Sequence, residues 1–288
     1  MVVLVLLIAS GANGFSSTPG LPAAGACQSA ILVEADTGIV LFGKNPHKAW
    51  HAASLTKMMV GLVALEEVRA GRMSLDEPVT VSRRAARVGG HKMYLRAGQR
   101  FSLAELLQAM LVSSANDAAV VVAEGLAGDV DTCIRAMNRR ANELGMTHTR
   151  YRTVNGLPLP EGKPGDLCSA ADVATLARAL LRYPLVLDWT SRQQVVLRGG
   201  RLRLRNTNRL AGHVNGVDGF KTGYHSRAGF NLAVTAERDG LRLICVVMGG
   251  ASSGTRFQIG ANLLEWGFGR FGAGRAATKS GQLQFARP

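Results

Sequence analysis

Residues 230–248, FNLAVTAERDGLRLICVVM, contain the clearest structural signal in the chain. Two stretches, Phe230 to Ala236 and Leu241 to Met248, flank the turn Arg238-Asp239-Gly240, and the second stretch is strongly apolar. Apolar runs of strand length that are joined by a short turn containing Asp-Gly are typical of a β-hairpin. These residues therefore predict two neighbouring antiparallel strands in the C-terminal part of the chain.

The N-terminal region repeats this signal, and the residues between the two hairpins have a helical period. Ala30 to Glu34 and Ile39 to Phe42 predict a hairpin across Asp36-Thr37-Gly38. Apolar spacing and capping residues then predict helices over Ser54 to Arg69, Ser102 to Leu111, Asn116 to Glu124, Asp131 to Leu144 and Ser169 to Arg182. The later residues predict a strand pair and a last helix, over Gln193 to Leu197, Arg201 to Arg205 and Thr255 to Trp266. We expect an α+β fold, in which an antiparallel sheet built from both termini is flanked by helices, with an inserted helical subdomain.

The composition excludes several classes of protein. The chain has 288 residues, of which 47% are hydrophobic and 19% charged, so it is too apolar for a disordered protein. Four cysteines exclude a disulfide scaffold, and the absence of CxxC and HExxH patterns gives no reason to expect a metal or another cofactor. The net charge of +14 favours an anionic neighbourhood, such as acidic lipid or a wall polymer. Only three tryptophans and scattered arginines argue against a nucleic-acid surface.

The first residues predict export. Val2 to Ala9 form an apolar run that fits a secretory signal and is too short to span a bilayer, and Ala24-Gly25-Ala26 resembles a cleavage site. The first basic residue is Lys44, so only the amino terminus charges the start of this segment. Lipid modification of Cys27 is an alternative means of attachment. We expect residues 1–26 to be a signal or anchor segment, residues 27–270 one domain, and residues 271–288 a disordered tail, in a protein that acts in the periplasm or on the outer face of the membrane.

Ser54-Leu55-Thr56-Lys57 is the first motif that suggests a catalytic function. Residues three apart lie on one helix face, and at a helix N-terminus the serine hydroxyl meets the positive end of the helix dipole. A neutral lysine can remove the proton of a serine nucleophile, provided that burial or a second cation lowers the pKa of that lysine. The spacing by itself is common, so the motif needs support from elsewhere in the chain.

Two further motifs supply that support. Ser114-Ala115-Asn116 lies between two predicted helices, where a hydroxyl and an amide can project into a cleft. Lys221-Thr222-Gly223 is predicted at a strand edge, where Lys221 would be the second cation that keeps Lys57 neutral and would attract a carboxylate. Gly223 would allow the backbone to approach a ligand closely. The order S-x-x-K, S-x-N, K-T-G is that of penicillin-binding proteins and class A β-lactamases.

At these residues the chain resembles the low-molecular-weight penicillin-binding proteins, which are serine-type D-alanyl-D-alanine carboxypeptidases. The resemblance covers about residues 28–270 and is carried by ASLTKMM from Ala53, SSANDAA from Ser113, VDGFKTGY from Val217, AGFNL from Ala228, VMGG from Val247 and LEWG from Leu264. It implies a β-lactamase/transpeptidase-like fold and hydrolysis of the terminal D-Ala-D-Ala bond of peptidoglycan stem peptides.

The resemblance also implies roles for individual residues. Ser54 would form the acyl-enzyme, Lys57 would be its general base, and Ser114 would relay the proton to the leaving D-alanine. Asn116 would hold the peptide, and the backbone N–H groups of Ser54 and Tyr224 would form the oxyanion hole. Lys221, Thr222 and Arg256 would bind the terminal carboxylate. Gly223 and Tyr224, which follow Thr222 directly, would also belong to the substrate-binding site. A β-lactam would acylate Ser54 in the same way.

Three other functions use a similar set of residues. A class A β-lactamase needs a glutamate that activates water, and the loop from Asn155 to Asp166 offers Glu161 and Asp166 without an E-x-x-x-N pattern. A D,D-endopeptidase would use the same residues on crosslinked peptides. A penicillin-binding wall protein without catalysis is the third alternative.

Overall fold

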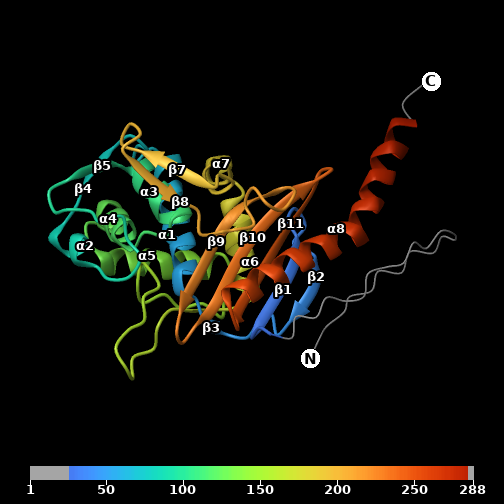
Figure 1. Ribbon diagram of the computed structural model, residues 1–288, viewed down its shortest axis with the longest axis horizontal. Helices are drawn as coiled ribbons and strands as arrows, with labels where there is room; N and C mark the ends of the chain where they lie inside the picture. Colours follow the sequence, from blue (N-terminus) through green and yellow to red (C-terminus); the bar gives the residue numbers. More distant parts are fainter. Residues whose placement is uncertain (1–25, 285–288) are drawn as a thin grey trace.

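The fold is organised around a five-stranded antiparallel sheet in the order β2-β1-β11-β10-β9 (Figure 1). The computed structural model describes residues 26–284. The sheet strands are β1 Ser29–Glu34, β2 Val40–Lys44, β9 Val217–His225, β10 Gly229–Arg238 and β11 Leu241–Gly250. Both predicted hairpins are present, and β11 joins them because it pairs with β1 on one side and with β10 on the other. The expectation of a sheet built from both ends of the chain is therefore confirmed.

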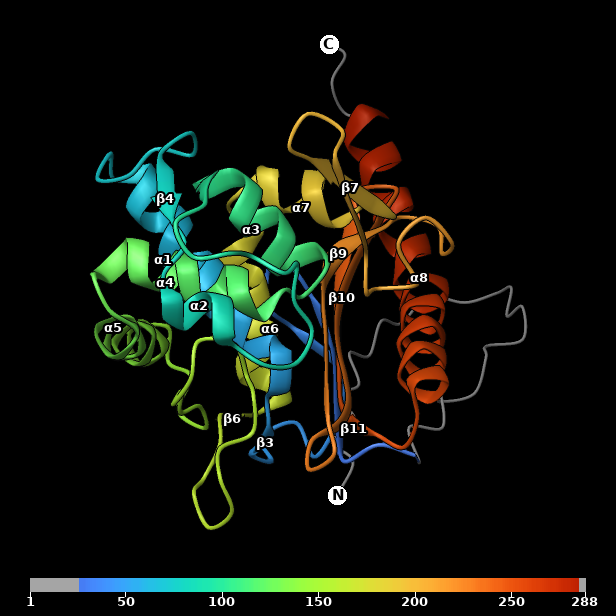
Figure 2. The same ribbon diagram turned by 60° about the vertical axis from the view of Figure 1, so that its left-hand side comes forward.

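Side chains on the two faces of the sheet enter two separate cores. Along β11, Ile244 and Val246 pack into the core beneath the helical part, whereas Cys245 and Val247 pack toward helix α8, Ser253–Gln284. This alternation follows from the two-residue period of a strand. Figure 2 shows the result edge-on, with α8 on one side of the sheet and the other helices on the opposite side. Since β11 is covered on both faces, its nearly continuous apolar sequence is explained.

The segment between β2 and β9 forms the helical part of the fold. It contains a 3-10 turn, Ala53–Leu55, and the helices α1 Thr56–Arg69, α2 Arg83–Arg87, α3 Leu103–Val112, α4 Asn116–Ala127, α5 Val130–Glu143, α6 Ala170–Leu180 and α7 Pro184–Thr190. Three short antiparallel pairs connect them, β3 Trp50–His51 with β6 Leu167–Cys168, β4 Pro78–Thr80 with β5 Arg100–Ser102, and β7 Gln194–Leu197 with β8 Leu202–Arg205. The predicted capping box is present, because Ser102 accepts from the backbone of Glu105 and Glu105 accepts from the backbone of Ser102.

The structure differs from the sequence expectations in two places. Helix α8 continues to Gln284, although the sequence predicts that the last helix ends at Trp266. The physical reason is that no proline interrupts the chain before Pro288 and that alanines recur at 273, 276 and 277. The elements α2, α7 and β3 to β6 were not predicted, because runs this short have no measurable period.

The predicted signal segment lies outside the described residues, apart from Ala26 at its end. Within residues 26–284, no helix has both the length and the apolar character that are needed to cross a bilayer. All four cysteines are buried, and Cys133, Cys168 and Cys245 form no disulfide.

Candidate active site

Ser54 and Lys57 meet at the start of α1. Ser54 lies in the 3-10 turn that leads into the helix, directly after Ala53, whose backbone has a strained φ of +47°. The Nζ atom of Lys57 lies 2.8 Å from the Oγ atom of Ser54 and donates to the carbonyl oxygen of Asn155 at 2.6 Å. Lys57 is fully buried, whereas Ser54 is partly exposed. A neutral amine in this position can take the proton of the serine hydroxyl.

Burial is the main reason that Lys57 can be neutral. It lowers the pKa of Lys57 to about 7, against the opposing effects of the Asp166 and Asp117 carboxylates. We had assigned this role to Lys221 as a second cation, and the structure corrects that assignment. Lys221 is itself buried, and its own pKa is lowered, first by burial and then by the charges of Lys57 and Arg256.

Ser114 and Asn116 lie at the junction of α3 and α4. Ser114 has a φ of +68°, which is an unusual conformation for a residue with a side chain. Its hydroxyl makes no hydrogen bond within the described part of the chain. Asn116 begins α4, and its side-chain amide donates to the carbonyl oxygen of Gly89 at 2.8 Å. The junction therefore leaves the Ser114 hydroxyl available to a ligand and holds Asn116 in place.

Strand β9 brings the third motif to the same place, at the edge of the sheet. A Cβ atom on Gly223 would lie 3.1 Å from the backbone nitrogen of Ser54, a tight contact that a glycine avoids. The two lysines also act on one neighbouring group, His91. The pKa of His91 is lowered first by burial and then by the charges of Lys221 and Lys57. Lys221 also donates to the carbonyl oxygen of Thr222 at 2.8 Å. The S-x-x-K and K-T-G motifs, more than 160 residues apart, thus form one site.

Tyr224 and Arg256 flank this strand. The Tyr224 ring is 57% exposed and stacks on Phe230, with the ring centroids 4.3 Å apart. Arg256 is buried and donates to the carbonyl oxygens of Gly223 at 3.0 Å and Asn231 at 3.2 Å. Its guanidinium group therefore lies behind the strand backbone at the K-T-G motif.

Sequence reasoning missed Asp117 and the Asn155 carbonyl group, and it considered Asp166 only as a possible activator of water. The Asp117 carboxylate accepts from the backbone N–H groups of Met93 and Leu95, which fixes the loop that contacts Asn116. The Asp166 carboxylate accepts from Thr56 at 2.8 Å and from the backbone of Arg152. Sequence position offered a weak signal for Asp117, next to Asn116, and none for the Asn155 carbonyl, since every residue has one.

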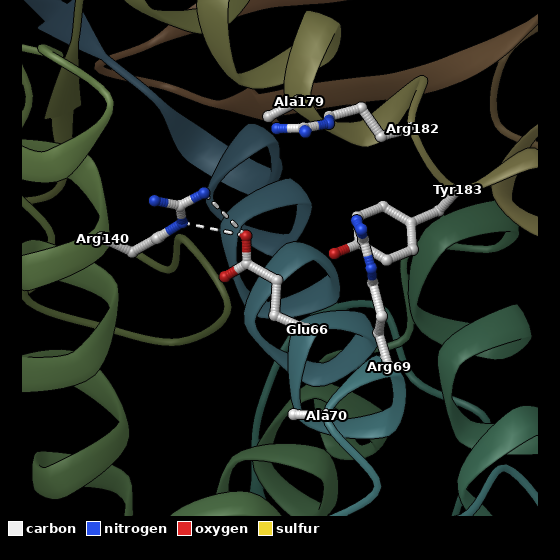
Figure 3. A pocket seen from close by; sticks show the side chains of 7 residues that line it. All are labelled: Glu66, Arg69, Ala70, Arg140, Ala179, Arg182 and Tyr183. Atoms are coloured by element: carbon white, nitrogen blue, oxygen red, sulfur yellow. Dashed lines mark hydrogen bonds and ion pairs between the residues drawn. The ribbon is translucent and has the colours of Figure 1, made fainter.

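Two histidines lie beside these motifs in the sequence, His51 three residues before Ser54 and His225 directly after Tyr224. The His51 and His225 rings are in edge contact, 5.7 Å apart, and burial lowers the pKa of His225 to about 4. Arg201, Arg203 and Arg205 alternate in the sequence, and all three are exposed. A cavity of about 340 Å³ lies between α1, α5 and α6, where Glu66 is ion-paired with Arg140 (Figure 3), and none of the motif residues lines it.

Comparison with known proteins places these features in a family. The family model described as D-alanyl-D-alanine carboxypeptidase matches residues 16–252. The D-alanyl-D-alanine carboxypeptidase DacF of Bacillus subtilis is 34% identical over 247 residues, which cover 85% of this chain and 62% of that protein. This chain spans 60% to 66% of the length of the first four carboxypeptidase relatives.

Two further proteins match over almost their whole length. A D-alanyl-D-alanine endopeptidase of Pseudomonas aeruginosa is 31% identical over 297 aligned positions, covering 98% of this chain and 93% of that protein. Penicillin-binding protein D2 of Listeria monocytogenes, solved in its ampicillin-bound form, superposes with a TM-score of 0.77 at 32% identity, covering 84% of this chain and 97% of that one. These matches confirm the predicted β-lactamase/transpeptidase-like fold.

Proposed function

Because this chain belongs to the D-alanyl-D-alanine carboxypeptidase family, we propose that it is a serine D,D-carboxypeptidase that removes the terminal D-alanine from peptidoglycan stem peptides. The observation that carries this proposal is the buried Lys57 amine, 2.8 Å from the Ser54 hydroxyl and with a pKa near neutrality. A base whose pKa lies near the working pH is the most effective general base.

The first half of the reaction forms an acyl-enzyme. The Oγ atom of Ser54 attacks the carbonyl carbon between the two D-alanines while its proton passes to the Nζ atom of Lys57. The negative charge that develops on the carbonyl oxygen is stabilised by the backbone N–H groups of Ser54 and Tyr224, and each such donor lowers the barrier by about 3 kcal/mol in other acyl transfers. Ser114 passes a proton to the leaving nitrogen and receives the proton that Lys57 had taken up, so that Lys57 is neutral again when D-alanine departs.

The second half returns the free enzyme. A water molecule attacks the ester carbonyl, Lys57 removes a proton from that water, and the Ser54 oxygen leaves and regains its proton. Asn116 holds the peptide, and the cationic side of β9, with Lys221, Thr222 and Arg256, receives the terminal carboxylate. Burial of the Asp166 carboxylate and its bond to Thr56 support this assignment over a class A β-lactamase, because that carboxylate is occupied by protein donors.

The partners follow from the same chemistry. A β-lactam mimics the D-Ala-D-Ala end and acylates Ser54, which the ampicillin-bound form of the Listeria relative supports. The substrate is a wall component, so the protein acts outside the cytoplasm. The net charge of +14 would draw it to an anionic membrane or wall surface.

The proposal is tested by measuring D-alanine release from diacetyl-L-Lys-D-Ala-D-Ala together with the intact mass of the protein after incubation with penicillin. We expect D-alanine release and a stoichiometric penicillin adduct, both of which disappear in Ser54→Ala. Rapid nitrocefin hydrolysis without D-alanine release would indicate a β-lactamase instead. Penicillin binding without an adduct would indicate a non-catalytic binding protein.

A D,D-endopeptidase is the second candidate function. The specific observation in its favour is that the chain spans 93% of the Pseudomonas endopeptidase, against 62% of the Bacillus carboxypeptidase. The two activities break the same kind of bond and differ in the leaving group, so a single protein can have both.

A further inference from the structure

The cavity of about 340 Å³ lies at the other end of α1 from the nucleophile (Figure 3). It is lined by Glu66, Arg69 and Ala70 from the last turn of α1, by Arg140 from α5, and by Ala179, Arg182 and Tyr183 from the end of α6 and the turn after it. Ser54 precedes the first turn of α1, and a helix of 14 residues spans about 20 Å. A ligand in this cavity would therefore leave the active site open to the substrate.

The lining carries three positive groups and one negative group, and the negative group is already paired. The Oε1 atom of Glu66 accepts from the Nε atom of Arg140 at 2.9 Å and lies 2.8 Å from its Nη2 atom. Arg140 also donates to Glu143 at 3.0 Å. By contrast, the guanidinium groups of Arg69 and Arg182 make no hydrogen bond or ion pair among the residues that the structure describes. Two positive charges thus lack an anionic partner.

Helix dipoles account for only part of this arrangement. Helices α1 and α6 both end at the cavity, and the C-terminal end of a helix carries a partial charge of about −0.5 that attracts a cation. Two such ends offset about one of the two unpaired positive charges. They also leave the N–H donors of the guanidinium groups unused, and these donors are arranged to bind pairs of oxygen atoms. The cavity therefore keeps a net positive charge and a surplus of donors.

The unpaired donors converge on one place. Figure 3 shows the side chains of Arg69, Arg182 and Tyr183 reaching toward the space beside Glu66 from three directions. The Tyr183 hydroxyl makes no hydrogen bond within the described part of the chain, so it is a third available donor. A phosphate group has three strong acceptor oxygens and a charge near −2 at neutral pH, which matches two guanidinium groups and a hydroxyl. A carboxylate has only two oxygens and a single charge.

We propose that this cavity is a binding site for a phosphate dianion, with Arg69 and Arg182 as its charged ligands and Tyr183 as the third donor. The proposal is independent of the chemistry at Ser54. Both arginines are exposed and Tyr183 is half-buried, so a phosphate group enters directly from solvent. A lipid headgroup and free phosphate offer the same chemistry, and the experiment separates these two sources. The net charge of +14 attracts any anion, whereas binding at this site depends on these three side chains.

The test is a calorimetric titration of the full chain with inorganic phosphate at constant ionic strength. The site variant is Arg69→Ala/Arg182→Ala. The matched control is Arg201→Ala/Arg203→Ala, which removes the same charge from two exposed arginines outside the cavity. We expect the wild type to bind one phosphate per chain, the site variant to have a Kd about tenfold higher or more, and the control to change by less than about twofold. Tyr183→Phe keeps the ring and should raise the Kd about fivefold.

Vesicles identify the source of the phosphate group. Sedimentation is measured with vesicles that contain phosphatidic acid and with phosphatidylserine vesicles of equal charge density. If a headgroup phosphate enters the cavity, the site variant should bind less than the control variant to phosphatidic acid and equally to phosphatidylserine. Equal binding of both variants to both lipids, together with weaker titration of inorganic phosphate by the site variant, would assign the cavity to soluble phosphate.

Three results would overturn the proposal. The first is wild-type protein that binds no inorganic phosphate. The second is an equal rise of the Kd in the site variant and the control variant, since general charge would then explain the binding. The third is unchanged phosphate binding in Tyr183→Phe, and this variant decides the question if the double variant fails to fold. Penicillin labelling monitors the fold, because the cavity lies at the opposite end of α1 from Ser54 and labelling should remain at the wild-type level.

Discussion

At the residue scale, the chemistry depends on the balance of effects on one ammonium group. Burial disfavours the charged form of Lys57, while the Asp166 and Asp117 carboxylates favour it, and the outcome is a pKa of about 7. A drier site without carboxylates would lower the pKa further and weaken the base. A solvated lysine would remain protonated and could not accept a proton.

This balance predicts the pH dependence of acylation. Neutral Lys57 is the active form, so the rate should fall as the pH drops through about 7, where the amine becomes protonated. Measuring the rate of penicillin acylation against pH should give an acid limb with its midpoint near this value. Lys57→Arg should lower the rate by about 10²- to 10⁴-fold, because a guanidinium cannot be deprotonated.

Lys221→Ala is the informative companion variant. Because burial is the first cause of the Lys57 shift, we expect the midpoint of the acid limb to move little. The value of kcat/KM for the peptide should nevertheless fall about tenfold, since a hydrogen-bond donor to the carboxylate is lost. A clear movement of the midpoint to higher pH would restore Lys221 as the main perturbing group.

At the element scale, the loop over residues 151–166 completes the site. Asp166 ties the loop to Thr56, and the positive φ of Gly156, +76°, turns the backbone so that the preceding carbonyl group of Asn155 accepts from Lys57. A Cβ atom on Gly156 would lie only 1.9 Å from the carbonyl oxygen of Ala53. The loop can therefore approach the nucleophile only with a glycine at this position.

This contact predicts different effects for two glycines in the same loop. Gly156→Ala and Gly162→Ala both place a side chain on a backbone with positive φ, but a Cβ atom on Gly162 meets nothing within 4 Å. We expect Gly162→Ala to cost about 1 kcal/mol of unfolding free energy and Gly156→Ala at least about 1 kcal/mol more. Gly156→Ala should also slow acylation, because the Asn155 carbonyl is displaced. Urea unfolding and penicillin labelling would check both effects, and equal stabilities would contradict the close contact.

At the scale of the whole molecule, the sheet and the helical part contribute different halves of the site. The nucleophile, the base and the S-x-N motif belong to the helical part, and the K-T-G motif belongs to the edge strand β9. An edge strand has a free side at which an extended peptide can lie. The net charge of +14 is a further property of the whole chain, and it predicts attraction to anionic surfaces.

This attraction should depend on salt. We expect the purified protein to sediment with vesicles that contain anionic lipid, and the bound fraction to fall steeply as the salt concentration rises, because screening weakens contacts between exposed charges. Zwitterionic vesicles are the control and should bind little at any salt concentration. Binding that is equal for both lipids and insensitive to salt would exclude a charge-driven association.

The two hairpins, most of the helices and the three motifs could be predicted because they depend on short-range patterns. The turn at Asp239-Gly240, the capping box at Ser102 and the i, i+3 pair of Ser54 and Lys57 are each contained within a few residues. What the chain does was then inferred from the order of these motifs. The length of α8 and the short elements α2 and α7 escaped prediction because their local pattern is weak.

The state of the base was decided only by the tertiary structure. The Asn155 carbonyl that binds Lys57 is 98 positions away in the sequence, and the Asp166 carboxylate that holds Thr56 is 110 positions away. A sequence shows that a lysine is present, but its pKa depends on how completely distant segments exclude water from it. For the same reason, Lys221 looked like the perturbing charge, and only the packing around Lys57 identified burial as the larger effect.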